Sequence, residues 1–119
     1  MKKTLVMGAS LKPNRYSFMA VNRLVTAGHD VVAFGLRSGE IANVKIDTEL
    51  LQYNDIDTVT LYLNPKNQEA YYEYIIGLKP KRVIFNPGTE NPVFYEMLRE
   101  NNIQYEVACT LVLLSIGEY

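Results

Sequence analysis

The sequence lacks the residues from which disulfide frameworks and metal centres are built. Its 119 residues include one cysteine, Cys109, and one histidine, His29. A single cysteine excludes an internal disulfide and is typical of a reducing compartment, so we expect a cytoplasmic protein. Because the two residues are isolated from each other in the sequence, we also predict no metal site.

Long apolar runs and a strong net charge are also missing. The opening Met-Lys-Lys is followed by only three consecutive apolar residues before Gly8, whereas a secretory signal needs about 7–15. The longest later run, around Leu111 to Leu114, is far shorter than the roughly 20 residues of a membrane span. The formal charge of −1 gives no reason to expect a nucleic acid or an anionic membrane as partner.

Apolar residues, by contrast, make up 48% of the chain, which is enough for a core. A length of 119 residues fits one domain, so we expect a single domain over residues 1–119. Short segments rich in Val, Ile and Leu predict strands buried on both faces, as in a parallel sheet. The expected strands are Thr4–Gly8, Asp30–Phe34, Val44–Ile46 at an edge, Ile56–Leu63, Arg82–Phe85 and Gln104–Ala108.

Capping signals place helices between these strands. Ser17 is the predicted N-cap of a helix that runs through Ala27 and is closed by Gly28. The pairs Asn64-Pro65 and Asn91-Pro92 each combine an N-cap residue with proline at the first helical position. Further helical segments are expected near Glu49–Gln52, as one turn, and at Thr110–Ile116.

The alternation of strands and helices predicts an α/β, Rossmann-like, doubly wound fold. Right-handed βαβ units would give a mostly parallel sheet of order 3-2-1-4-5-6 with helices on both faces. Ligands of such folds bind beyond the carboxyl ends of the strands, where the strand order reverses. Here that point lies between the strands Thr4–Gly8 and Ile56–Leu63, so the loops that follow the strands contain the candidate binding residues.

The loop after the first strand has the composition of a phosphate site. It starts with a glycine that permits a tight turn, and the two small residues behind it would let backbone N–H groups approach a phosphate. The following helix adds the positive end of its dipole, and two cationic side chains add full charges. These residues are Gly8, Ala9, Ser10, Lys12, Arg15 and Ser17.

The other loops at this edge add cations and turn residues. Arg37 lies in a loop bracketed by Gly35 and Gly39, and Lys66 follows a later strand. The loops at this edge contain few carboxylates to balance these cations, chiefly that of Glu90. We therefore expect an anionic ligand. Helix capping alone would explain the Asn-Pro pairs, and Arg37 has an alternative interpretation as a solvated surface charge. Further candidates in these loops are Asn64, Pro65, Asn86, Pro87 and Gly88.

Two common nucleotide signatures are absent. The Gly-x-Gly-x-x-Gly pattern would need glycines where Ser10 and Pro13 stand, and no acidic residue ends the second strand to bind a ribose. There is also no Gly-Lys-Ser or Gly-Lys-Thr, which excludes a P-loop NTPase. NAD is therefore disfavoured as the ligand.

Three motifs in these loops are more specific. They read Gly-Ala-Ser-x-Lys-Pro-x-Arg-Tyr-Ser at 8–17, Arg-x-x-Glu-Ile at 37–41 and Asn-Pro-Gly-Thr-Glu-Asn at 86–91. They resemble motifs of the small stand-alone CoA-binding domain proteins, which look like the CoA-binding domain of the succinyl-CoA synthetase alpha subunit. The resemblance covers essentially the whole chain, and it implies coenzyme A or an acyl-CoA as the small-molecule ligand.

The resemblance also implies a position for each part of the ligand. The residues named in the first loop would line the phosphate region, and Arg37 would lie near the adenosine end, at the 3′-phosphate. Asn64, Pro65 and residues 86–88 would flank the pantetheine path. The second loop departs from the family's usual Val-Asn-Pro-Lys and reads Phe-Gly-Leu-Arg at 34–37.

The single histidine and the single cysteine are the residues best suited to catalysis, but their positions in the sequence do not favour it. His29 starts the second strand, at the amino end of the sheet opposite the crevice, and Cys109 has no base nearby in the sequence. We therefore expect a module that binds, senses or carries CoA without catalysis of its own. The alternative is a small NAD(P)- or nucleotide-dependent enzyme, a reductase or transferase, that a partner chain completes. The apolar segment Ala108–Ile116 leaves room for a homodimer surface.

Overall fold

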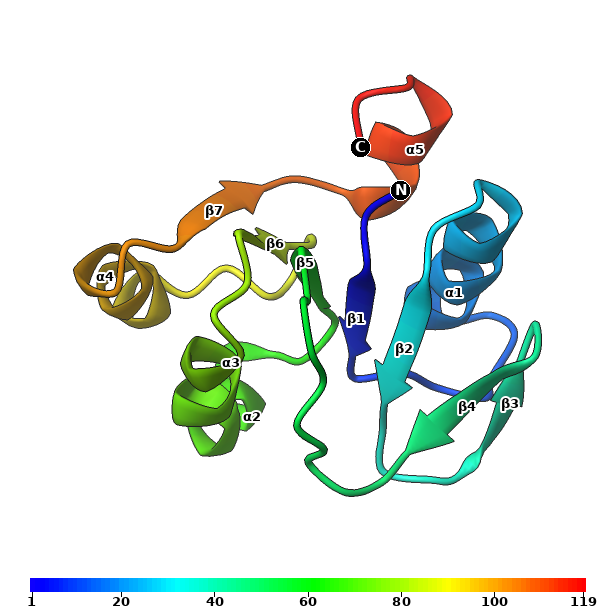
Figure 1. Cartoon of the computed structure of the whole chain (residues 1–119), viewed down its shortest axis with the longest axis horizontal. Helices are drawn as coiled ribbons and strands as arrows, with labels where there is room; N and C mark the ends of the chain where they lie inside the picture. The colour runs from blue at the N-terminus through cyan, green and yellow to red at the C-terminus, as the bar shows by residue number, and fades with distance from the viewer.

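The computed structural model describes all 119 residues and shows a seven-stranded sheet with helices on both faces (Figure 1). The strands are β1 (Thr4–Met7), β2 (Val31–Phe34), β3 (Gly39–Ile41), β4 (Val44–Asp47), β5 (Thr58–Leu61), β6 (Arg82–Phe85) and β7 (Gln104–Val107). The helices are α1 (Tyr16–Thr26), α2 (Pro65–Gln68), the 3-10 turn η1 (Glu69–Tyr71), α3 (Tyr72–Leu78), α4 (Pro92–Glu100) and α5 (Thr110–Ser115).

The strand order is β3-β4-β2-β1-β5-β6-β7, and every pair is parallel except β3 with β4. Without β3 this is the expected order 3-2-1-4-5-6, so the doubly wound, Rossmann-like fold is confirmed. The chain returns to the centre of the sheet at β5, which pairs with β1 from Thr4 opposite Thr58 to Met7 opposite Leu61. The reversal of strand order therefore falls between β1 and β5, as predicted.

The expectation that Val44–Ile46 lies at the edge is wrong: it is part of β4, and the strand β3, which was not predicted from the sequence, forms the edge. It pairs antiparallel with β4 through a two-residue turn at Ala42 and Asn43, both of which have positive φ. In this hairpin Glu40 lies opposite Lys45, an arrangement of opposite charges that favours the pairing.

The helical turn expected near Glu49–Gln52 is wrong, because this stretch is irregular. Helices in proteins are stabilised mainly by packing of an apolar face. Leu50 and Leu51 remain 43% and 41% exposed, so the segment has no such packing.

The central strands contribute to two apolar clusters, one on each face of the sheet. Leu5 and Met7 of β1 belong to the cluster that includes Phe94 of α4 and residues of α3. Val6 belongs to the cluster on the other face, together with Leu24 of α1. Because the central strands are covered on both faces, near-continuous apolar runs are the correct signal for them.

α1 ends as predicted but begins differently. Gly28 has a φ of +88°, and the N–H group of His29 donates to the carbonyl oxygen of Leu24 (3.1 Å), which closes the helix. The prediction of Ser17 as the N-cap is wrong. Arg15 holds that position in an extended conformation, and Ser17 is buried in the first turn of the helix.

The two Asn-Pro pairs are helix starts, as the capping interpretation predicted. The side chain of Asn64 accepts a hydrogen bond from the N–H group of Asn67 (2.9 Å) at the start of α2. The side chain of Asn91 does the same for Phe94 (3.3 Å) at the start of α4. Both caps satisfy an N–H group that the helix itself leaves free.

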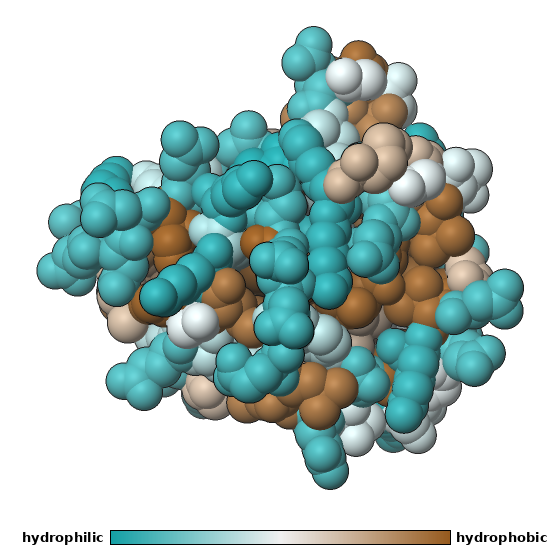
Figure 2. Space-filling view, in the orientation of Figure 1, coloured by the Kyte–Doolittle hydropathy of each residue, from teal (hydrophilic) through white to brown (hydrophobic).

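The surface seen in Figure 2 is mostly hydrophilic, with hydrophobic residues in separate patches. Val107 of β7 and Val112 and Ile116 in and after α5 are each more than half exposed. The homodimer surface expected around residues 108–116 stays a prediction. None of the helices combines the length and the apolar character that crossing a bilayer requires.

Candidate functional site

A crevice of about 980 Å³ lies beyond the carboxyl ends of β1, β2, β5 and β6. Its walls are the loops that follow these strands, together with the start of α1 and residues of α2 and η1. It lies at the edge toward which the arrows of β1 and β2 point in Figure 1. The volume is at the upper end of the range typical of small-molecule sites, roughly 300–1,000 Å³.

Two glycines allow the loops after β1 and β2 to approach each other closely. Gly8 has a φ of +99°, which favours glycine, and a Cβ atom at Gly35 would lie 2.3 Å from the carbonyl oxygen of Ala9. The carbonyl oxygen of Phe34 accepts hydrogen bonds from the N–H groups of Gly8 (2.9 Å) and Ala9 (2.8 Å). The two loops therefore form one hydrogen-bonded unit.

These bonds correct one expectation for the first loop. The N–H group of Ala9 donates to Phe34, so it does not face a phosphate. The next turn is held by Ser10, whose hydroxyl oxygen accepts from the N–H group of Lys12 (3.2 Å). In the loop after β1 and the first turn of α1, six N–H groups have no acceptor within the protein. They are those of Ser10, Leu11, Asn14, Tyr16, Ser17 and Phe18. The available donors thus lie slightly later in the loop than predicted and include the first turn of α1.

Four cationic side chains line the crevice, and no carboxylate does. They are Lys12, Arg15, Arg37 and Lys66. The ion pairs of the molecule involve other residues, so these four charges are not neutralised within the protein. The carboxylate of Glu90, expected at this edge, accepts a hydrogen bond from the N–H group of Gly88 (2.8 Å) and does not line the crevice. The crevice therefore attracts anions.

The wall formed by the residues after β5 and by α2 and η1 contributes two tyrosines and a leucine to the lining, together with Lys66. Tyr62 and Leu63 directly follow β5, and Tyr71 ends η1. The ring of Tyr71 packs edge-on against Phe34, with centroids 5.4 Å apart. Sequence reasoning from loop composition missed this wall. The available signal was the strand period of two, which puts Tyr62 on the same face as the buried Thr60.

All but two of the predicted binding residues line the crevice. Those that do are Gly8, Ala9, Ser10, Lys12, Arg15, Ser17, Gly35, Arg37, Asn64, Pro87 and Gly88. The exceptions are Pro65, which starts α2, and Asn86, which is 2% exposed. The side-chain nitrogen of Asn86 donates to the Thr60 hydroxyl (2.7 Å), and its oxygen accepts from the N–H group of Thr110 (2.8 Å). Asn86 thus ties β6 to β5 and α5.

The match to a family decides what kind of protein has this crevice. A sequence model described as a CoA binding domain matches residues 2–115, which is nearly the whole chain. The chain belongs to the CoA binding domain family. The resemblance noted in the loop motifs is therefore confirmed. No curated protein is significantly similar to the chain.

Solved structures give the same fold. The chain is 50% identical to an uncharacterized protein of known crystal structure, with a TM-score of 0.97, over 100% of this chain and 98% of that one. It is 29% identical to a hypothetical protein from Pyrococcus horikoshii, with a TM-score of 0.83, over 93% and 80% of the two chains. A protein from Thermus thermophilus shares the fold at 20% identity, with a TM-score of 0.86, over 99% and 90%.

The crevice of this CoA binding domain contains few groups suited to proton transfer or nucleophilic attack. No histidine, cysteine, aspartate or glutamate lines it. His29 lies at the amino edge of the sheet, where its Nδ1 accepts a hydrogen bond from the N–H group of Lys2 (3.1 Å). Cys109 is half-buried and directly precedes α5. Burial raises the pKa of Tyr62 to about 12, so its phenol is neutral near pH 7.

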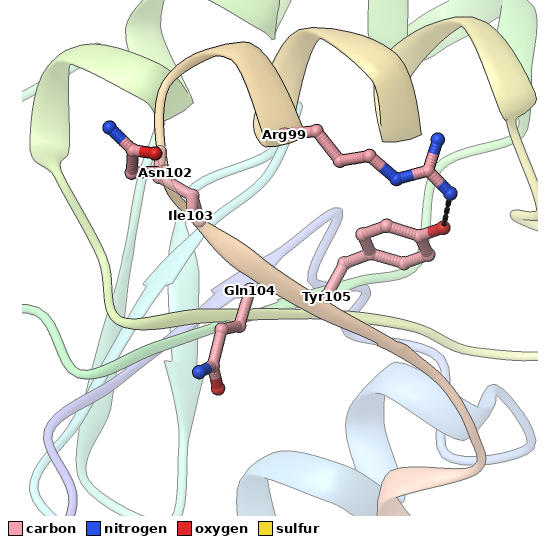
Figure 3. A pocket seen from close by; sticks show the side chains of 5 residues that line it. All are labelled: Arg99, Asn102, Ile103, Gln104 and Tyr105. Atoms are coloured by element: carbon pink, nitrogen blue, oxygen red, sulfur yellow. Dashed lines mark hydrogen bonds between the residues drawn. The ribbon is translucent and has the colours of Figure 1, made fainter.

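A second hollow, of about 440 Å³, lies at the amino end of β7, beside the end of α4 (Figure 3). Figure 3 shows the Arg99 side chain extended over the strand, where its guanidinium donates to the Tyr105 hydroxyl (2.7 Å). The same guanidinium is paired with Glu96 (2.7 Å). Because its one cation is already paired, this hollow lacks the free charge that marks the crevice at the carboxyl edge.

Proposed function

We propose that the chain binds coenzyme A or an acyl-CoA in the crevice at the carboxyl edge of the sheet, as a binding, sensing or carrier module without catalysis of its own. The observation that carries this proposal is the group of four unpaired cations in a crevice lined by no carboxylate. CoA carries a 5′-diphosphate and a 3′-phosphate on one half and a neutral pantetheine arm on the other. Membership of the CoA binding domain family supports the same ligand.

The first loop is the proposed site of the diphosphate. Its support is the free N–H groups of Ser10 and Leu11, the side chains of Lys12 and Arg15, and the start of α1. A helix of 11 residues presents about half a positive charge at its N-terminus. Hydrogen bonds to charged groups contribute about 1.5–3 kcal/mol each. On the neighbouring loop, we assign Arg37 to the 3′-phosphate.

The wall formed by the residues after β5 and by α2 and η1 is the proposed path of the pantetheine arm. Tyr62, Leu63 and Tyr71 offer apolar surface there, and Pro87 and Gly88 flank it from the loop after β6. A neutral arm loses little solvation against such a surface, whereas a phosphate would lose much more. Three of the four cations, Lys12, Arg15 and Arg37, follow β1 and β2, and only Lys66 lies on the wall with the tyrosines, so most of the charge is on the side proposed for the phosphates.

The lining residues support a role without catalysis. General acid–base catalysis needs a group that exchanges a proton near the working pH, and covalent catalysis needs an activated nucleophile. The lining offers cations, amides, hydroxyls and apolar groups instead. These groups bind and orient a ligand.

A ligand titration tests the proposal. Thermal unfolding and calorimetry are followed with CoA, dephospho-CoA, ATP, NADP and NAD. We expect CoA to bind most tightly, and at 100 times its Kd to raise the free energy of unfolding by about 2.7 kcal/mol. Dephospho-CoA should bind more weakly, and NAD should stabilise least. Stabilisation by NAD or NADP without any by CoA would contradict the proposal.

The variant Ser10→Asp locates the site. A carboxylate at this position can still accept the hydrogen bond from Lys12, so the turn should persist while a negative charge now faces the phosphates. We expect CoA binding to become undetectable with the unfolding temperature nearly unchanged. Asn14→Asp adds the same charge to the same loop outside the crevice lining and should weaken binding far less. Equal effects of the two variants would move the site away from this loop.

A further inference from the structure

A buried glutamine joins two of the loops that line the crevice. Gln68 ends α2 and is fully buried, and its side-chain nitrogen donates hydrogen bonds to the carbonyl oxygens of Leu63 and Thr89 (both 2.8 Å). Leu63 follows β5 and Thr89 follows β6, and both residues line the crevice. The side chain of Gln68 therefore connects the loop after β5 with the loop after β6.

Both ends of the Gln68 amide have partners inside the protein. Carbonyl oxygens can only accept, so the NH₂ group is the end that faces Leu63 and Thr89, and both of its hydrogens are used. The oxygen at the other end accepts from the side-chain nitrogen of Asn91 (2.9 Å), and that nitrogen also donates to the Tyr72 hydroxyl (2.8 Å). Because a buried amide without partners is costly, these bonds fix the place of the side chain.

Gln68 is also the main buried anchor of the wall formed by α2 and η1. It is the only buried residue of α2, and η1 has none, although Tyr71 of η1 adds an edge-on contact with Phe34. By comparison, α4 is held by the fully buried side chains of Phe94 and Leu98. Hydrogen bonds depend on direction, whereas apolar contacts do not, so a wall attached through Gln68 has a defined position.

We propose that Gln68 is a positioning residue, which holds the two sides of the pantetheine path at the separation that the arm needs. It does not line the crevice itself, so it acts through Leu63 and Thr89. This inference rests on the proposed binding of CoA. A site that is held in place before the ligand arrives loses less conformational freedom on binding, so removal of its support weakens binding.

Gln68→Met tests this role, because methionine has a similar length and volume but donates no hydrogen bond. The ligands compared by calorimetry are CoA and adenosine 3′,5′-bisphosphate, which has no pantetheine arm. We expect CoA affinity to fall about 5–10-fold and the affinity for the bisphosphate to stay within about twofold of the wild-type value. A general loss of stability would not separate the two ligands in this way.

Tyr72→Phe is the matched control. It removes a hydroxyl group from the same network but leaves the three hydrogen bonds of the Gln68 side chain in place, and Tyr72 does not line the crevice. Both ligands should bind to this variant as they bind to the wild type. A selective loss of CoA affinity in Tyr72→Phe as large as that in Gln68→Met would overturn the assignment to Gln68.

A measurement on the wild type does not depend on how well the variant folds. The NMR signals of the Gln68 side-chain NH₂ group should shift when CoA is added and stay in place with the bisphosphate, because only CoA has an arm that reaches Leu63 and Thr89. Unchanged CoA affinity in Gln68→Met, equal weakening of both ligands, or an NH₂ signal that CoA does not shift overturns the positioning role. The proposed function fails separately, and only if the wild type does not bind CoA.

Discussion

The two edges of the sheet both carry cations but use them differently. At the amino edge, Arg82 donates to the Thr58 hydroxyl (3.1 Å), pairs with Glu106 (3.2 Å) and stacks over the ring of Tyr119 (4.6 Å). Lys81 of the same edge lies 3.9 Å from Asp57. At the carboxyl edge, the four cations of the crevice have no carboxylate partner.

This difference separates charge that is neutralised within the fold from charge that is available to a ligand. A cation that is paired and stacked contributes to stability, and its removal should affect unfolding. A cation without a protein partner contributes little to stability and raises the local potential for an anion. Substitutions at the carboxyl edge should therefore change binding, and substitutions at the amino edge should change stability.

Among the substitutions that compare the two edges, Gly35→Ala at the carboxyl edge should have the largest effect. The added Cβ atom would lie 2.3 Å from the carbonyl oxygen of Ala9, so the first loop must move away from the second. We expect CoA affinity to fall about a hundredfold, because the proposed phosphate donors of the first loop would move and lose charge-assisted hydrogen bonds that contribute about 1.5–3 kcal/mol each. Stability should also fall, by about 1–3 kcal/mol. Calorimetry and urea unfolding measure the two effects.

Gly77→Ala is the matched control for this change. Gly77 lies in α3 with open space where its Cβ would be, so the substitution should slightly stabilise the helix and leave CoA binding unchanged. Wild-type affinity in Gly35→Ala would show that the contact between the two loops does not control the site.

Arg82→Met tests the amino edge. It removes a half-buried guanidinium that bonds two side chains and stacks on a ring, and we expect the free energy of unfolding to fall by about 1–3 kcal/mol. CoA affinity should stay at the wild-type value. Arg99→Met is the control. Its guanidinium also bonds two side chains, Glu96 and Tyr105, and lies over the Tyr105 ring, but it is 59% exposed where that of Arg82 is 12% exposed, so its ion pair should contribute less than about 1 kcal/mol. Loss of CoA affinity in Arg82→Met would end the distinction between the two edges.

Arg37→Ala sharpens the assignment within the carboxyl edge. If Arg37 contacts the 3′-phosphate, the variant should bind CoA about tenfold more weakly and dephospho-CoA with nearly unchanged affinity. Its stability should not change, since Arg37 has no ion-pair partner. Lys45→Ala removes an exposed cation of the adjacent hairpin outside the crevice and should leave both affinities unchanged. Equal weakening of both ligands would exclude the 3′-phosphate as the partner of Arg37.

The sequence was enough to predict which loops lie at the carboxyl edge, but not every strand of the sheet. Runs such as Thr4–Met7 predict buried parallel strands, and the topology then places the loops that follow them at one edge. β3 could not be predicted in this way. It depends on pairing with β4 across a turn in which Ala42 adopts a positive φ, a conformation that alanine rarely signals.

The chemistry of individual loop groups depends on contacts that sequence does not reveal. Composition indicated that the first loop binds phosphate, but the N–H group of Ala9 is taken by Phe34, some 25 residues away in the sequence. Asn86 has a loop position like that of its neighbours Pro87 and Gly88, yet its side chain points into the protein. Tyr62 and Tyr71 join the crevice only because the strands bring their elements together.

The smallest expected effect concerns pH and the amino edge. Burial, together with the positive charge of Lys2 nearby, lowers the pKa of His29 below its usual 6.5. The folded state therefore disfavours the protonated ring, so stability is fully present above about pH 6.5 and declines as the pH falls toward the lower, folded-state pKa. Between about pH 7 and pH 5.5, the unfolding temperature of the wild type should drop slightly more than that of His29→Gln. Because His29 lies at the opposite edge from the crevice, the two proteins should bind CoA with the same affinity at each pH. A pH dependence of CoA binding that disappears in His29→Gln would mean that the two edges are coupled through the sheet.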